Sequence, residues 1–241
     1  IAARMIRILS RFAPFVCAGP NGSGKTNILE ALGVLGAATF KEVTPETLME
    51  RNVRPARALL YKSSFQAHDL RRLITLAAHG ANGVLYQLGL DPADEGGTRW
   101  RIFSERLEDK ERKILRRNAR SCLIFDAEGK SQRIAEPVPT ETYASSAASL
   151  NPDAKSVRAM MDLLKGFCVF SPSTQVLRGL AEDRARAPLG LGGGGLPSAL
   201  RELLFPKERR LGAFDIDEIL ELIGWADDLS VIPSSEAKLS P

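Results

Sequence analysis

The apolar positions near the start of the chain predict a strand, a tight loop and a helix, in that order. Residues 14–18, Pro-Phe-Val-Cys-Ala, form a short apolar run that is typical of a buried parallel strand. A glycine-rich segment follows over residues 19–26. Apolar residues then recur at the spacing of one helix face over residues 28–35. This order of elements predicts an α/β fold at the start of the chain.

The later pattern predicts a mixture of short helices and strands. Helical spacing occurs over residues 45–51, 67–78, 157–164, 198–204 and 216–223. Alternating or short apolar runs predict strands over residues 83–90, 100–107, 122–125, 132–134 and 167–170. Residues 126–130 predict the turn of a hairpin. Loops are expected over residues 91–97, 137–152 and 190–195.

We expect one domain over residues 1–241, divided into three stretches. Residues 1–40 hold the loop and its flanking strand and helix, residues 41–155 form a mixed α/β insertion rich in strands, and residues 156–241 continue the domain with helices and strands. The chain begins with isoleucine and ends without a closing element. We therefore expect a piece of a longer protein, incomplete at its C-terminus.

Composition adds few constraints to this picture. The chain has 241 residues, of which 44% are hydrophobic and 26% charged, as in a soluble globular protein. Its net charge of +4, from 33 basic and 29 acidic residues, permits contact with nucleic acid without arguing for it. No apolar stretch approaches the roughly 18 residues of a membrane span, and no signal peptide opens the chain. We expect a cytoplasmic protein without a membrane partner.

The cysteines and histidines do not predict a metal site. Cys17, Cys122 and Cys168 lie in apolar runs and none has a CxxC partner, so buried, reduced thiols are expected. His68 and His79 are isolated and are expected to be ordinary surface or partly buried residues.

Residues 19–26, Gly-Pro-Asn-Gly-Ser-Gly-Lys-Thr, fit the phosphate-binding pattern G-x-x-x-x-G-K-[ST] at every position. Glycines let backbone N–H groups turn inward around phosphates, and the N-terminus of the following helix carries partial positive charge. Lys25 is placed to reach the β- and γ-phosphates, and the Thr26 hydroxyl to ligate Mg²⁺. The expected cofactors are ATP and Mg²⁺, and the expected binding residues are Gly19, Asn21, Gly22, Ser23, Gly24, Lys25, Thr26 and Asn27. The alternative is a glycine turn that only connects strand and helix.

The wider run 19–32, Gly-Pro-Asn-Gly-Ser-Gly-Lys-Thr-Asn-Ile-Leu-Glu-Ala-Leu, resembles the ABC-type ATPases of the SMC and RecF-like group. It is most similar to their smaller AAA-family relatives, called AAA domain 21 or overcoming-lysogenization-defect (OLD)-like ATPases. Phe-Ser-Pro-Ser at 170–173, Arg178 and Pro-Leu-Gly at 188–190 resemble the same proteins more weakly. The resemblance implies an ABC- or SMC-like P-loop NTPase lobe with a β-rich insertion.

The resemblance also implies an activity and partners. Two such lobes form a homodimer or higher oligomer around two ATP molecules, and the ATP state controls a partner effector, in some cases a nuclease. Phage defence or DNA repair is the implied setting, with nucleic acid as a further ligand. The alternatives are a nucleotide-binding scaffold that does not hydrolyse ATP, and a P-loop kinase or GTPase. A GTPase is disfavoured because the chain has no Asn/Thr-Lys-x-Asp segment.

Hydrolysis in this family needs a Walker B strand, a signature Ser-Gly pair and a switch histidine, and the sequence supplies no convincing copy. Residues 123–128, Leu-Ile-Phe-Asp-Ala-Glu, resemble Walker B, but the glutamate comes one residue late and Gly-Lys follows as in a hairpin. Residues 191–195, Leu-Gly-Gly-Gly-Gly, lack the signature serine and are expected to lead into the helix at 198. The catalytic residues therefore stay unknown, and we expect them beyond residue 241.

A charged segment over residues 108–120 is expected to be a solvated face or an exposed loop. Its basic residues are candidates for nucleic-acid phosphates, with the solvated face as the favoured interpretation because acidic residues lie beside them. These basic residues are Arg112, Lys113, Arg116, Arg117 and Arg120.

Overall fold

The computed structural model of the chain describes residues 6–7, 18–21, 23–54, 74–80, 83–93, 100–110, 112–183, 189–196, 198–199, 210–211, 214–222 and 225. The chain divides into two compact units, which we call unit 1 (Ile1–Val169) and unit 2 (Phe170–Pro241). Each unit is described by itself. The sheet and the glycine-rich loop at 19–26 both belong to unit 1.

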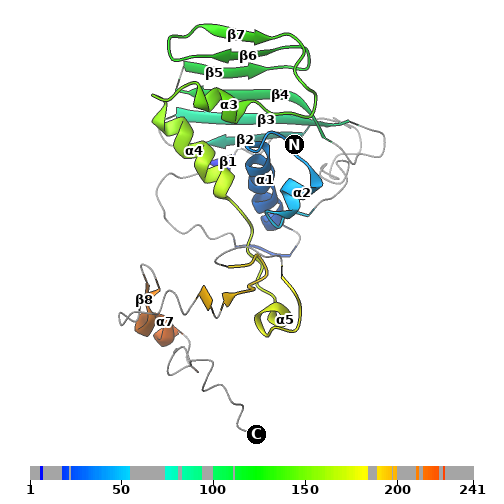
Figure 1. Cartoon of the computed structure of the whole chain (residues 1–241). Coiled ribbons are helices and arrows are strands. Elements are labelled where there is room, and N and C mark those ends of the chain that lie inside the picture. Colours follow the sequence, from blue (N-terminus) through cyan, green and yellow to red (C-terminus); the bar gives the residue numbers. More distant parts are fainter. Residues whose placement is uncertain are drawn as a thin grey trace. The chain divides into compact units, whose positions relative to one another are not determined.

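A seven-stranded sheet runs through the described part of unit 1 (Figure 1). Its strands are β1 (Ile6–Arg7), β2 (Ile74–His79), β3 (Val84–Pro92), β4 (Trp100–Asp109), β5 (Arg112–Arg117), β6 (Cys122–Phe125) and β7 (Ser131–Ile134). They lie side by side in chain order. β1 pairs in parallel with β2, and every later pair is antiparallel. From β2 to β7 the sheet is thus a meander, which short connections can build.

The alternation of side chains gives this sheet one packed face and one polar face. A packed row crosses β3 to β6 at register positions occupied by Tyr86, Leu107, Leu115 and Ile124. All four are buried. The adjacent register positions on β3 to β7 carry Gln87, Arg106, Arg116, Leu123 and Arg133. We call this second row the polar row, and its members retain solvent exposure.

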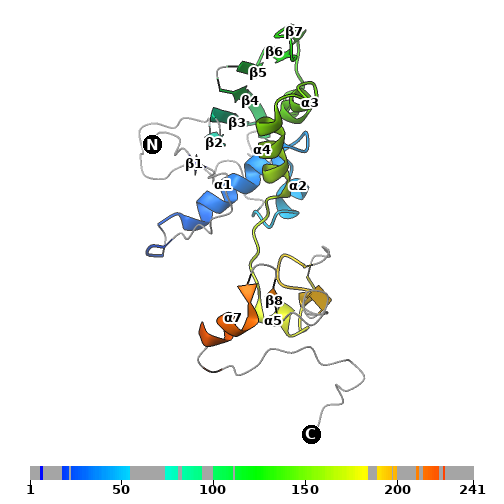
Figure 2. The same ribbon diagram turned by 90° about the vertical axis from the view of Figure 1, so that its left-hand side faces the viewer.

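Helices cover the packed face. α3 (Ala144–Ser149) and α4 (Lys155–Gly166) contact the middle strands, and α1 (Lys25–Ala38) packs against α4 (Figure 2). α4 is amphipathic and buries Val157, Met160, Met161 and Leu164. α1 and α4 approach closely at Gly36, where an added Cβ would lie 2.5 Å from the carbonyl oxygen of Leu164. A larger residue at Gly36 would therefore force the two helices apart.

The short helix α2 (Pro45–Met49) forms where the sequence predicts it. Thr44 and Thr47 cap it reciprocally: Thr47 N–H donates to Thr44 Oγ1 at 3.3 Å and Thr44 N–H to Thr47 Oγ1 at 2.9 Å. Pro45 suits the first turn because it needs no hydrogen-bond acceptor there.

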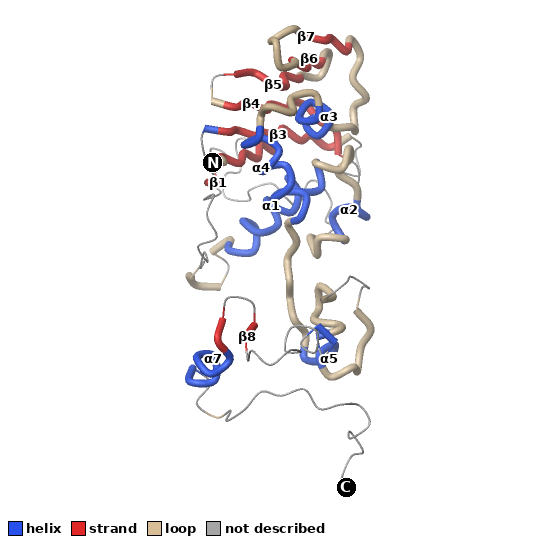
Figure 3. The backbone as a smooth tube through the Cα atoms, turned by 60° about the vertical axis from the view of Figure 1, so that its left-hand side comes forward, coloured by secondary structure: helices blue, strands red, loops and turns tan. Residues whose placement is uncertain are grey.

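Unit 2 contains α5 (Thr174–Leu177), the β8–β9 pair (Arg210–Leu211 and Phe214–Asp215) and α7 (Ile216–Leu222) (Figure 3). The helix predicted at 216–223 is confirmed in α7. Residues 198–199 are helical, and the rest of the helix predicted there lies outside the described residues.

Several predicted elements of unit 1 are also confirmed. They are the helices at 28–35, 45–51 and 157–164 and the strands at 83–90, 100–107, 122–125 and 132–134. Residues 14–17 of the strand predicted at 14–18, and residues 94–97 of a predicted loop, lie outside the described residues.

Four expectations were wrong within the described residues. Residues 74–78 of a predicted helix form β2, because pairing with β3 outweighs the helical spacing of the leucines. Part of the loop predicted at 137–152 is α3, which buries Ala144, Ala147 and Ala148. The strand predicted at 167–170 makes no ladder; the N–H of Val169 donates instead to the carbonyl of Arg51 at 2.9 Å. The charged segment at 108–120, expected to be a solvated face or an exposed loop, contains the end of β4 and all of β5 and buries Ile114, Leu115 and Arg117.

Candidate functional site

The glycine-rich loop leads directly into α1. Gly24 precedes the helix with φ of 87°, a left-handed conformation that favours glycine, and α1 begins at Lys25. The N–H of Ile28 donates to the Gly24 carbonyl at 3.3 Å and closes the first turn. Gly22 lies outside the described residues, and the other predicted binding residues are described.

Lys25 bonds back onto the loop. Its Nζ donates to the carbonyl of Gly19 at 2.6 Å and to that of Pro20 at 2.8 Å. The N–H of Ser23 also donates to the Pro20 carbonyl, at 3.3 Å. The loop is therefore bent so that the ammonium group lies against its first two residues.

The start of α1 presents unpaired donors. The N–H groups of Lys25, Thr26 and Asn27 find no partner among the described residues, as expected for the first turn of a helix. No side chain in the described structure caps this end, and no acidic residue occupies the first turn. Thr26 and Asn27 are exposed. The helix dipole and the N–H groups that are unpaired within the described residues favour an anion at this end of α1, and Lys25 adds a positive charge at the first helical position.

The far half of α1 is held firmly. An added Cβ on Gly33 would lie 2.2 Å from Val53 Cγ2, so the segment after α2 packs against the helix backbone. Nearer the loop, Glu30 is buried and accepts from Arg54 Nε at 2.6 Å. These contacts fix the direction in which the helix N-terminus points.

Neither segment considered for hydrolysis offers a catalytic arrangement. Residues 122–125 and 131–134 form the hairpin β6–β7, and Asp126 accepts from the N–H of Lys130 at 2.8 Å inside its turn. The hairpin interpretation of residues 123–128 is confirmed.

The glycine loop expected at 190–195 in unit 2 donates hydrogen bonds to a carboxylate. Asp183 Oδ2 accepts from the N–H of Gly192 at 2.9 Å and from the N–H of Gly194 at 2.8 Å.

Two arginines of the charged segment at 108–120 make hydrogen bonds that hold parts of unit 1 together. Arg112 donates to Asp153 and Asn151 and to the Asp126 carbonyl, so it ties the hairpin to the α3–α4 connection. Arg117 is buried and donates to the carbonyls of Glu141 and Val138. Both arginines therefore have structural hydrogen bonds within unit 1, and burial removes Arg117 from the exposed basic residues expected to meet nucleic acid.

Arg117 belongs to a buried polar cluster that sequence reasoning missed. Glu105, 2% exposed, accepts from Tyr86 Oη at 3.1 Å and from the N–H groups of Tyr143 and Ala144 at 2.8 and 3.1 Å. Burial raises the pKa of Glu105 to about 7, against the effect of these donors and of Arg117. Burial likewise raises the pKa of Tyr86 well above its ordinary value. The one available signal was a carboxylate, Glu105, inside the strand predicted at 100–107; Arg117 lies in a segment that was not predicted to be a strand, so its pairing with Glu105 is known only from the structure.

The other candidate reactive residues are the cysteines and histidines. Cys122 is buried, as predicted, while Cys168 is only partly buried, and Cys17 and His68 lie outside the described residues. The described histidines, cysteines and carboxylates include no group of three that could hold a metal ion. Among the described helices, none has the length and apolar character to cross a membrane.

Comparison of the chain with family models, with curated proteins and with solved structures finds no match.

Proposed function

We propose that the loop at 19–26 and the start of α1 bind the triphosphate of ATP together with Mg²⁺. The observation that carries the proposal is that the loop contacted by the Lys25 ammonium leads directly into a helix whose first N–H groups have no partner among the described residues. Backbone N–H groups and one ammonium supply both directional hydrogen bonds and charge to phosphate oxygens.

Binding would exchange the partners of Lys25. Its Nζ would leave the Gly19 and Pro20 carbonyls for the β- and γ-phosphates, which carry full negative charge. The exposed Thr26 hydroxyl would ligate Mg²⁺, which prefers oxygen ligands and keeps several waters. Asn21, Ser23 and Asn27 are exposed residues of the loop and the first turn of α1, and they would contact the nucleotide.

The activity we propose is that of an ATPase of the SMC/RecF-like class, whose ATP state controls dimerisation and a partner effector in phage defence or DNA repair. The support is the sequence of the loop and of the helix that follows it. The alternative is a nucleotide-binding scaffold without turnover. One observation favours it: residues 123–128, which most resemble a Walker B strand, form a hairpin in the described structure.

The experiment compares ATP binding and steady-state hydrolysis by the purified protein, with and without duplex DNA, in wild type, Lys25→Ala and Thr26→Ala. Lys130→Ala, in the exposed β6–β7 turn, is the matched charge control. We expect Lys25→Ala to weaken ATP binding more than tenfold, because a charge-assisted contact contributes about 1.5–3 kcal/mol. Thr26→Ala should remove only the Mg²⁺-dependent part of the affinity.

The outcomes separate the two candidates. Turnover that Lys25→Ala abolishes supports the ATPase. Magnesium-dependent ATP binding without turnover supports the scaffold. ATP affinity that is equal in wild type and Lys25→Ala would contradict both.

A further inference from the structure

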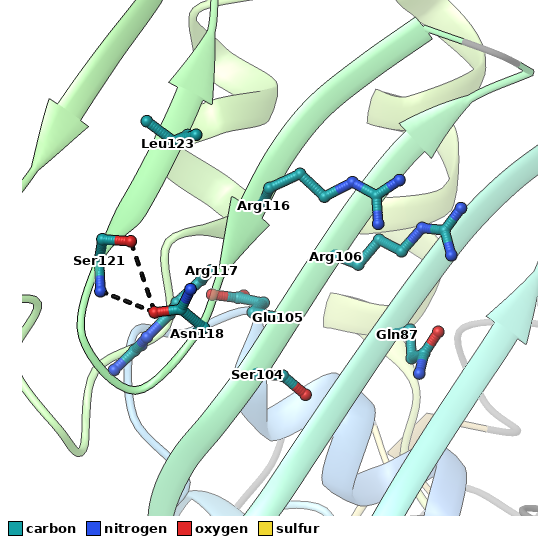
Figure 4. A pocket seen from close by; sticks show the side chains of 9 residues that line it. All are labelled: Gln87, Ser104, Glu105, Arg106, Arg116, Arg117, Asn118, Ser121 and Leu123. Atoms are coloured by element: carbon teal, nitrogen blue, oxygen red, sulfur yellow. Dashed lines mark hydrogen bonds between the residues drawn. The ribbon is translucent and has the colours of Figure 1, made fainter.

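A second polar site lies in unit 1 on the face of the sheet opposite α3 and α4. A pocket of about 370 Å³ opens there, within the size range of small-ligand sites (Figure 4). Its outward-facing polar lining comes from three strands and from the β5–β6 turn. The polar residues of this lining are Gln87, Ser104, Arg106, Arg116, Asn118 and Ser121.

Two arginines define the charge of this pocket. Arg106 and Arg116 are direct register partners on β4 and β5, and both point across the sheet in the same direction in Figure 4. Like charges directly opposite each other destabilise a sheet unless something compensates them. The compensation is Glu108, whose Oε2 accepts from Arg106 and whose Oε1 accepts from Arg116. One carboxylate thus serves two guanidinium groups, and the triad retains one positive charge.

The two guanidinium groups keep donors for a ligand. Each has five N–H donors, and in the described residues each gives one to Glu108. Their side chains are 38% and 36% exposed, whereas that of Glu108 is 8% exposed. The polar row also places the Gln87 amide beside Arg106, and it places Arg133 beyond Leu123. The other buried acid of this region, Glu105, bonds to Tyr86 and to the start of α3 instead.

We propose that this pocket binds a phosphate group. Paired guanidinium forks match the geometry of phosphate oxygens, and a phosphate can accept from both arginines at once. The phosphate comes from a nucleic-acid strand or from a free nucleotide. The repetition of arginine along the polar row, at Arg106, Arg116 and Arg133, favours successive phosphates of a strand.

The test uses Lys25→Ala as the background, so that the loop at 19–26 does not contribute and the outcome is independent of the proposed ATP site. Fluorescence anisotropy of a labelled single-stranded oligonucleotide and calorimetry with AMP measure the two sources of phosphate. In this background we compare Arg116→Ala with Arg158→Ala, which removes an exposed arginine from α4 on the other side of the sheet.

We expect Arg116→Ala to weaken binding about tenfold, the effect of losing a charge-assisted hydrogen bond, and to lower the salt slope of strand binding by about one. Arg158→Ala should bind like the background. Glu108→Gln distinguishes loss of the site from damage to the fold. It removes the carboxylate charge to which both guanidinium groups donate, so we expect binding to tighten rather than weaken. Loss of oligonucleotide affinity in Arg116→Ala assigns the site to a strand, and loss of AMP affinity alone assigns it to a nucleotide. Binding of neither ligand, or equal binding by Arg116→Ala and Arg158→Ala, overturns the proposal.

Discussion

The replacement Glu105→Gln tests how the buried carboxyl links stability to pH. The carboxyl is 2% exposed, and burial raises its pKa from 4.5 to about 7. In the unfolded chain it titrates near 4.5, so between these values folding takes up a proton. Stability from this group is therefore fully present below pH 4.5 and is lost as the pH rises through about 7.

The size of the pH-dependent change in stability follows from the shift in the pKa of Glu105. One pKa unit corresponds to about 1.4 kcal/mol, so the shift from 4.5 to about 7 corresponds to about 3 kcal/mol of unfolding free energy. Glutamine has the same shape and does not titrate. It also turns an N–H₂ group toward a backbone N–H, since Glu105 accepts with both oxygens. We expect this second effect to lower stability by an amount that does not change with pH.

Urea unfolding at a series of pH values measures the effect, with the fluorescence of Trp100 as the signal. Trp100 is 5% exposed in β4, whereas Trp225 is 86% exposed and changes little on unfolding. The difference between wild type and Glu105→Gln cancels the titration of all other carboxyls. We expect wild type to lose about 3 kcal/mol relative to Glu105→Gln between pH 4.5 and pH 8. Parallel stability curves for the two proteins would refute the reasoning.

Two further predictions concern the packing of unit 1. Gly36→Ala should destabilise it by about 2 kcal/mol, because the new Cβ would lie 2.5 Å from the Leu164 carbonyl oxygen. Gly166→Ala is the control, since nothing lies within 4 Å of its added Cβ, and equal urea midpoints for the two variants would contradict the close helix approach. Arg112→Ala should lower the free energy of unfolding by about 1–2 kcal/mol, because Asn151 is buried and Arg112 donates to it. Thermal unfolding measures this cost, and an unchanged midpoint would show that the hairpin needs no such link.

Local sequence signals determined the elements that a few consecutive residues can specify. The phosphate-binding pattern at 19–26 located the loop and the start of α1, because Gly24 adopts a left-handed conformation and α1 follows it. The helical spacing that starts at Pro45 located α2, and the Asp-Ala-Glu-Gly-Lys turn located the β6–β7 hairpin. In each case the capping or turn residue acts within about four positions of itself.

Pairing over long distances decided the elements that the sequence misassigned. Leucines at helical spacing over 67–78 fit a helix, yet residues 74–79 form β2 because β3 supplies backbone partners from Leu85 to Leu90. The small residues of α3 did not predict a helix, because Ala144 and its neighbours become buried only against the sheet that they cover.

Strand pairing also decides which face of the sheet a single charged side chain of β4 or β5 occupies. Arg116 and Arg117 are neighbours in the sequence and identical in charge. The strand places Arg117 on the packed face with Glu105 and Arg116 on the polar face with Arg106. Composition predicted a solvated segment, and it could not separate the two arginines, because only the register of β4 with β5 determines which face each one occupies.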